Sequence, residues 1–120
     1  MYVASIIGAT LSIVTLDEWA IEVAKTLIDT LAVKPRIASI RAIDMTARQI
    51  VDDLDGARAA TIREVRNAVR DDGAAAIYLG AMTLGTLDVD VPLRRELHVP
   101  VLNPVQIAFG TAVQYLRTLD

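Results

Sequence analysis

The amino-acid sequence predicts an α/β fold in three layers: a four-stranded parallel sheet with flanking helices. Short apolar runs alternate along the chain with longer segments in which apolar residues recur at helical spacing. This alternation is typical of βαβ units, whose crossover connections are right-handed. The length of 120 residues suits one domain, and no repeat, low-complexity tract or linker divides it. We therefore expect residues 1–120 to form a single α/β lobe.

The first strand is predicted at residues 11–15, "LSIVT", which are mostly apolar and β-branched. The preceding segment 1–9, "MYVASIIGA", lacks a clear strand pattern and is compatible with a helix end that leads into this strand. A helix is predicted over 16–31, where Asp17 and Glu18 in the first turn favour the helix dipole. Its apolar residues at helical spacing are Trp19, Val23, Leu27 and Leu31. For Trp19 we expect packing in the core or at an interface rather than a role in covering a pocket.

The second strand is predicted at residues 35–42, "PRIASIRA", because of its β-branched residues. Residues 47–54 show a weak helical pattern, and residues 57–73 show a strong one. The apolar face of the strong pattern comprises Ile62, Val65 and Val69. Gly73 is the expected stop, since glycine readily adopts the left-handed conformation that ends many helices.

The third strand is predicted at residues 74–80, "AAAIYLG". The chain from there to Leu97 is expected to be partly helical, with a helix start near Pro92, since proline is tolerated in a first turn. Residues 99–104, "VPVLNP", form a short fourth strand, and residues 105–119 form a closing helix.

The composition excludes several classes of function. The 12 basic and 15 acidic side chains give a net charge of -3. The sequence shows no stripe of basic residues that could bind along a phosphate backbone, so a nucleic-acid partner is not expected. The chain has no cysteine, which excludes disulfides, thiolate metal sites and a thiol nucleophile of its own. Apolar residues make up 53% and the mean hydropathy is +0.42. We expect part of this apolar surface to face a partner.

The first 16 residues carry no charged side chain, which raises the question of a membrane segment. A spanning helix needs roughly 20 apolar residues, whereas this stretch is short and is interrupted by Gly8, Thr10 and Ser12. A signal peptide needs a basic start and a cleavage site, and this stretch has no basic start. We expect this segment to be buried within the folded protein. We also expect no membrane partner and a cytoplasmic location.

Ligands of open parallel sheets bind beyond the carboxyl ends of the strands. The four loops predicted at this edge are residues 15–17, 41–44, 80–85 and 103–105. In "LGAMTLG", Gly80 ends the third strand, and the backbone N–H groups after it can bind an anion if a helix begins there. A plain strand-to-helix turn explains the same spacing. A phosphate loop is excluded, because the required Lys and Ser/Thr are missing.

Thr15 and Arg41 are further candidates at the same edge. The Thr15 hydroxyl either binds a carboxylate or caps the following helix. The Arg41 guanidinium either holds a substrate carboxylate or pairs with Asp44. The only histidine, His98, precedes the fourth strand at the opposite edge, so we expect a surface residue and neither a catalytic triad nor a zinc site. Three carboxylates are expected to be solvated: Asp52, Asp53 and Asp55.

Four motifs, in this order, resemble the aspartate/glutamate/hydantoin racemase superfamily, which also includes allantoin racemases, maleate isomerases and arylmalonate decarboxylases. They are "LSIVTL", "ASIRAID", "DGAAAIYLGAMTLG" and "ELHVPVLNPVQIAFGTAVQYL", and they extend over nearly the whole chain. The resemblance implies one lobe of a racemase-like fold, namely the second lobe with its closing helix. It also implies a cofactor-independent racemase or isomerase of a small carbon acid, such as an amino acid, a hydantoin or a related carboxylate. The implied partners are this small-molecule substrate and either a second lobe or a homo-oligomer.

In this family one cysteine from each lobe flanks the substrate, one removing the α-proton and the other delivering a proton to the opposite face. Ala81 stands at the position of the second-lobe cysteine, and a methyl group cannot exchange a proton. The resemblance places substrate binding at Thr15, Leu16, Arg41, Gly80, Met82, Thr83 and Pro104. Three explanations of Ala81 stay open: a deliberate replacement, a natural divergent member, or a fragment studied for its fold. The alternative function is a non-catalytic α/β binding or structural module.

Overall fold

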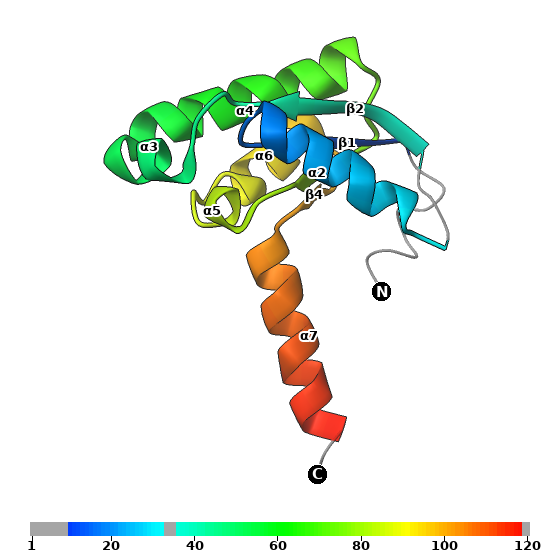
Figure 1. The fold of residues 1–120 in the computed structure, drawn as a ribbon. Helices are drawn as coiled ribbons and strands as arrows, with labels where there is room; N and C mark the ends of the chain where they lie inside the picture. Colours follow the sequence, from blue (N-terminus) through cyan, green and yellow to red (C-terminus); the bar gives the residue numbers. More distant parts are fainter. Residues whose placement is uncertain (1–9, 33–35, 119–120) are drawn as a thin grey trace.

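A computed structural model describes residues 10–32 and 36–118, and the structural statements below refer to this part of the chain. Its centre is a four-stranded sheet in the order β2-β1-β3-β4 (Figure 1). The strands are β1 (Thr10–Thr15), β2 (Arg36–Ala42), β3 (Ala76–Leu79) and β4 (Val101–Leu102). All three strand pairs are parallel, which confirms the predicted fold class. The expectation for residues 1–9 lies outside the described residues.

Helices cover both faces of this sheet, so the lobe has three layers (Figure 1). They are α2 (Glu18–Asp29), α3 (Ala47–Asp52), α4 (Leu54–Asp71), α5 (Met82–Gly85), α6 (Asp90–Leu97) and α7 (Pro104–Thr118). Alternate residues of β1 point to opposite faces, as the pleat of a strand requires. Val14 packs in one cluster with residues of α4 and α6, whereas Ile13 packs in a second cluster with Ile28 of α2 and Ile107 of α7.

Local side-chain caps explain where several helices begin. Asp17 caps α2, since its carboxylate accepts the Ala20 N–H at 3.0 Å. Thr46 and Gln49 form a reciprocal capping box at the start of α3. Asp53 caps α4, which therefore begins three residues before the predicted segment 57–73. Gly73 has a φ of 72° directly after the cap of α4, as predicted for a helix stop.

The structure corrects the prediction for the apolar residues of α2. Trp19 is 76% exposed and Leu27 is 60% exposed, so packing of Trp19 in the core is wrong within the described residues. The face of α2 that approaches the sheet instead carries Ala24 and Ile28. Alanine lets the helix backbone come close to the strands, and the bulkier residues of the periodic pattern lie on the side away from the sheet.

The second half of the chain follows the prediction with shifted boundaries. α6 begins at Asp90, so Pro92 lies within its first turn, and β4 is only two residues long. α7 begins at Pro104 and then extends away from the rest of the molecule (Figure 1). Residues 108–118 of α7 are exposed, and among the described residues they lack the cover that a core helix has.

Candidate functional site

The carboxyl ends of β1 and β3 bring Thr15 and Gly80 into contact. The Gly80 N–H donates to the Val14 carbonyl at 2.7 Å, which extends the ladder between these strands one residue beyond the end of β3. A Cβ placed on Gly80 would lie 3.2 Å from the Thr15 Cβ and 3.4 Å from its hydroxyl oxygen. Only a residue without a side chain fits this approach. The turn after β3 is therefore pressed against the Thr15 side chain.

Thr15 itself is almost fully buried, with 2% of its surface exposed. Asp17 caps α2, so the Thr15 hydroxyl does not have the capping role that was considered for it. Among the described residues this hydroxyl makes no hydrogen bond, whereas the Thr15 carbonyl accepts the Ile43 N–H at 3.0 Å. The hydroxyl is thus a donor with no acceptor in residues 10–32 and 36–118, at the edge where the strands end.

Ala81 follows Gly80 and holds the first position before α5. Its backbone is extended (φ -145°, ψ 142°), and its carbonyl accepts the Leu84 N–H at 3.1 Å. The half-buried methyl group packs against the larger apolar cluster. The first N–H groups of a helix have no intrahelical acceptor. The amides of Met82 and Thr83, which follow the Gly80 turn, therefore have no acceptor within α5.

Asn103 is a structural residue of this edge that the sequence analysis did not single out. It is buried at the end of β4, where its side-chain amide donates to the Gly85 carbonyl at 2.9 Å. Its side-chain oxygen accepts the Val105 N–H at 2.9 Å and so caps α7. Asn103 thereby ties the end of α5 to the start of α7. The signal in the sequence was the Asn-Pro pair at a strand end, because asparagine is favoured as a helix cap and proline at the next position.

The other positions implied by the family resemblance differ in exposure. Met82 is 57% exposed beside Ala81, and Thr83 is half-buried. Pro104 is buried at the start of α7. Leu16 is half-buried against the larger apolar cluster, and its carbonyl accepts the Met45 N–H at 3.1 Å. Leu16 and Pro104 thus follow the ends of β1 and β4, on either side of the Gly80 turn.

Arg41 is engaged away from this edge. Its guanidinium donates to both carboxylate oxygens of Asp72, at 2.6 and 3.1 Å, and to Glu64 at 3.2 Å. Asp72 also accepts a hydrogen bond from the Ser39 hydroxyl at 2.6 Å. Ser39 lies in the middle of β2, so Asp72 is placed beside the middle of this strand and not at its carboxyl end. The pairing of Arg41 with Asp44, one of the two roles considered for this side chain, is not observed, because these contacts take its place. The structure does not bring the guanidinium together with Thr15 and Gly80.

These contacts perturb both charged partners. The hydrogen bond from Arg41, with a smaller contribution from Ser39, lowers the pKa of Asp72 to about 2 from 3.8. The hydrogen bond to Asp72, and then the one to Glu64, raise the pKa of Arg41 further above its usual range. Both side chains are more than two-thirds buried, so the pair links β2 firmly to the end of α4.

Apart from Arg41, which is bound to Asp72 and Glu64, the four loops at the carboxyl edge carry no basic side chain. Residues 15–17, 80–85 and 103–105 include no lysine or arginine, whereas Asp17 and the exposed Asp44 lie in the loops after β1 and β2. Hydrogen-bond donors at this edge are therefore a hydroxyl and backbone amides. Such donors suit a neutral carbonyl group as well as an anion.

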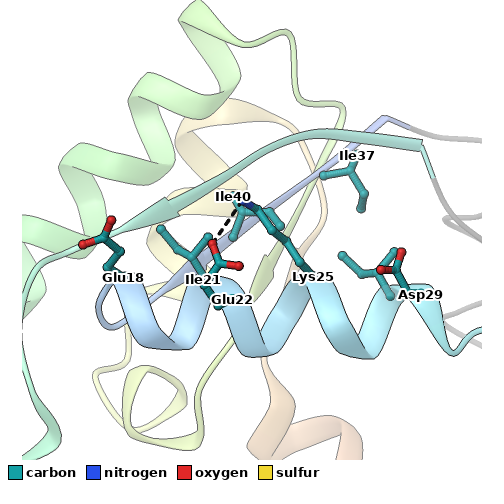
Figure 2. Close-up of a pocket in the computed structure, with 8 residues that line it drawn as sticks. Glu18, Ile21, Glu22, Lys25, Asp29, Ile37 and Ile40 are labelled. Atoms are coloured by element: carbon teal, nitrogen blue, oxygen red, sulfur yellow. Dashed lines mark hydrogen bonds and ion pairs between the residues drawn. The ribbon is translucent and has the colours of Figure 1, made fainter.

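An open groove of about 590 Å³ lies elsewhere, between α2 and the edge strand β2 (Figure 2). Its apolar wall consists of Ile21, Ile28, Ile37 and Ile40. The charged residues along α2 at the same groove are Glu18, Glu22, Lys25 and Asp29. Lys25 pairs with Glu22 at 3.3 Å, and both side chains are largely exposed. None of the residues that the family resemblance selects lines this groove.

The remaining expectations concern metals, membranes and the surface. Within residues 10–32 and 36–118, no three side chains of His, Cys, Asp or Glu gather as metal ligands, and no helix has the length and hydropathy to cross a membrane. His98 is exposed and ends α6 with a φ of 55°. Asp52, Asp53 and Asp55 are exposed, as predicted.

Comparisons with known proteins connect this fold to one family. The family model described as Asp/Glu/Hydantoin racemase matches residues 1–112. A hydantoin racemase from Pseudomonas sp. (strain NS671) is 30% identical over 105 residues, which are 88% of this chain and 41% of that protein. The crystal structure of an allantoin racemase from Pseudomonas fluorescens matches with a TM-score of 0.79 at 27% identity, over 98% of this chain and 49% of that one. An allantoin racemase from Klebsiella pneumoniae matches with a TM-score of 0.82 at 28% identity, over 98% of this chain and 47% of that one. The chain thus spans about half the length of the relatives it matches.

Proposed function

This chain belongs to the Asp/Glu/hydantoin racemase family, and on that premise we propose that it forms the substrate-binding half of a cofactor-independent racemase or isomerase site. The observation that carries the proposal is the contact between Thr15 and Gly80 at the carboxyl edge. It puts a hydroxyl that has no acceptor in the described part of the chain against the turn whose amides follow β3. We propose residues 1–120 as one lobe, and the cytoplasm as its compartment.

In this proposal the Thr15 hydroxyl and amides from residues 81–83 donate hydrogen bonds to one oxygen of the substrate, whereas the Gly80 N–H is already bound to the Val14 carbonyl. Removal of a proton next to a carbonyl group leaves negative charge on that oxygen. Fixed donors aimed at such developing charge lower the barrier, because they need not reorganise during the reaction. Asn103 acts as a positioning residue here, since it holds the end of α5 through Gly85. Leu16, Met82 and Pro104 would shape the walls of the site.

We propose a hydantoin-like ring as the substrate rather than a free amino acid. Arg41, the one basic side chain of these described edge loops, is held by Asp72 and Glu64, and Asp17 and Asp44 would repel a carboxylate. The carbonyl groups of a hydantoin carry no full charge and accept hydrogen bonds from amides and hydroxyls. The hydantoin racemase and allantoin racemases among the relatives are consistent with this choice.

Ala81 limits what the chain contributes to the reaction. Its methyl group lies at the turn where the family resemblance places a cysteine, and it can neither remove nor deliver a proton. Proton transfer would need a group from a second lobe or a partner chain, and a second group in place of Ala81. This chain alone is therefore proposed to bind and polarise the substrate without racemising it.

A chimera tests the proposal. This chain is joined to the part of the Pseudomonas hydantoin racemase that it does not match, once with Ala81 and once with Ala81→Cys. We expect the Ala81→Cys chimera to racemise a chiral hydantoin, and the Ala81 chimera to show no racemisation above background, because inversion needs a proton donor or acceptor on both faces. Ala81→Ser is the matched control, since a hydroxyl of similar size is a far weaker acid than a thiol. Binding without racemisation in all three chimeras would favour a binding module, and absence of binding would contradict the proposed site.

A further inference from the structure

α7 presents an apolar stripe on the side away from its own sheet. Phe109, Ala112, Val113 and Leu116 recur at intervals of three and four residues, which places them on one helix face. Ile107, on the opposite side, packs against the cluster under α2. Phe109 is 73% exposed and Leu116 is 62% exposed. An isolated helix with such a face is marginal in water.

α2 presents a second stripe of the same kind. Trp19, Val23 and Leu27 repeat every four residues on the side away from the sheet, while Ala24 and Ile28 face the strands. Of the twelve large hydrophobic residues that are exposed in the described part of the chain, seven lie on α2 and α7. Such concentration on two helices marks an interaction surface rather than scattered surface residues.

Charge indicates which surfaces fit together. Residues 104–118 of α7 carry one charged side chain, Arg117, and no carboxylate. α2 carries three carboxylates against one lysine, and Glu18 and Glu22 lie in its first half beside the groove with β2 (Figure 2). Pairing of α2 with α2 would place like charges together, whereas pairing of α7 with α2 places opposite charges together.

We propose that two copies of this chain form a reciprocal dimer, in which α7 of each copy packs antiparallel on α2 of the other. In the antiparallel direction Leu116 meets Trp19, Phe109 meets Leu27, and Arg117 reaches Glu18. The two stripes match in length, because each extends over about two turns. The helix dipoles also oppose one another in this direction, which is favourable.

The available area suits a stable dimer. At roughly 100 Å² of apolar surface for each exposed side chain, the six large residues of the two stripes offer on the order of 600 Å² per copy. A standard protein interface buries about 800 Å² per partner. A reciprocal arrangement uses both stripes of both copies, whereas pairing of α7 with α7 would leave the α2 stripes exposed.

Sedimentation equilibrium of the wild-type chain in the micromolar range measures the oligomeric state. We expect a mass of twice 13.0 kDa. Phe109→Asp and Leu27→Asp are each expected to give monomers with unchanged circular dichroism. Val51→Asp is the control, because Val51 is 66% exposed on α3 and outside both stripes; it should remain a dimer. A monomeric wild-type chain would overturn the proposal and would point to the rest of a longer protein as the occupant.

Mixing of variants distinguishes the reciprocal arrangement from other dimers. An equimolar mixture of the Phe109→Asp and Leu27→Asp chains retains one intact pair of α7 and α2, so it should form a heterodimer that neither chain forms alone. Absence of this heterodimer would contradict the reciprocal arrangement. Arg117→Glu should weaken dimerisation by about tenfold, and Glu18→Arg in the same chain should restore it. Failure of this restoration would contradict the antiparallel direction.

Discussion

Replacement of Gly80 with alanine probes the contact that defines the carboxyl edge. The new Cβ would lie 2.8 Å from the Ile13 Cγ2 and 3.2 Å from the Thr15 Cβ, well inside the normal carbon separation of about 3.5–4.0 Å. Ile13 and Thr15 are both buried and β-branched, so neither side chain can rotate away freely. Gly80 does not have a positive φ, so the effect is steric.

The expected cost is that of an overpacked core, about 1–3 kcal/mol. For a chain of this length it corresponds to a fall in Tm of roughly 5–10 °C. Urea unfolding followed by circular dichroism measures it. Gly110→Ala is the matched control, since a Cβ there meets nothing within 4 Å and α7 is helical at this position. This control should be neutral or stabilising by up to about 1 kcal/mol. Equal unfolding midpoints for Gly80→Ala and the wild type would refute the close approach of β1 and β3 at their ends.

Three further predictions concern stability. The folded-state pKa of Asp72 is lowered to about 2 from 3.8, so its contribution is complete above pH 3.8 and is lost as the pH falls to about 2. Asp72→Asn should therefore lower the free energy of unfolding by about 2 kcal/mol at pH 7 and remove its decrease between pH 4 and pH 2, as measured by urea unfolding. Asp71→Asn, at an exposed neighbouring position, should change this free energy little. The same pH dependence of unfolding in Asp72→Asn and the wild type would contradict this. Asn103→Ala removes the cap of α7 and the hydrogen bond to the Gly85 carbonyl, and should lower the free energy of unfolding by about 1–3 kcal/mol. An unchanged Tm in thermal unfolding would show that these two hydrogen bonds do not stabilise the fold. Thr46→Ala breaks the capping box of α3 and should cost about 1 kcal/mol by the same assay, and no loss would exclude that cap.

The order of elements was predictable because hydrophobic periodicity differs between strands and helices. The runs at residues 11–15 and 74–80 are apolar on both faces, as strands of a parallel sheet must be, and both became strands of the sheet. The long helix α4 followed from its apolar face and from Gly73 as a stop. Boundaries shifted where a side chain such as Asp53 capped a helix earlier than the apolar pattern began.

Periodicity failed to identify the buried face of α2. The pattern with the largest side chains predicted the face with Trp19, but the sheet is covered by the face with Ala24 and Ile28. Periodicity shows that a helix has an apolar face and does not show what that face contacts. In α2 two apolar faces share one helix, and only tertiary packing decides between them.

The candidate site was predictable in part, for a topological reason. Parallel strands end at one edge, so Thr15 and the Gly80 turn had to lie near each other once the strand order placed β1 beside β3. The engagement of Arg41 was not predictable, because its partner Asp72 lies 31 residues away and reaches it only through the packing of α4. Asn103 was missed because its two hydrogen bonds link elements that the sequence analysis treated separately.

An amide NMR titration of this chain with a hydantoin tests the central claim most directly. We expect concentration-dependent shifts confined to Thr15 and residues 80–83, and a loss of these shifts in Gly80→Ala. Shifts at the groove between α2 and β2 instead, or no shift up to the solubility limit of the ligand, would contradict substrate binding at the carboxyl edge.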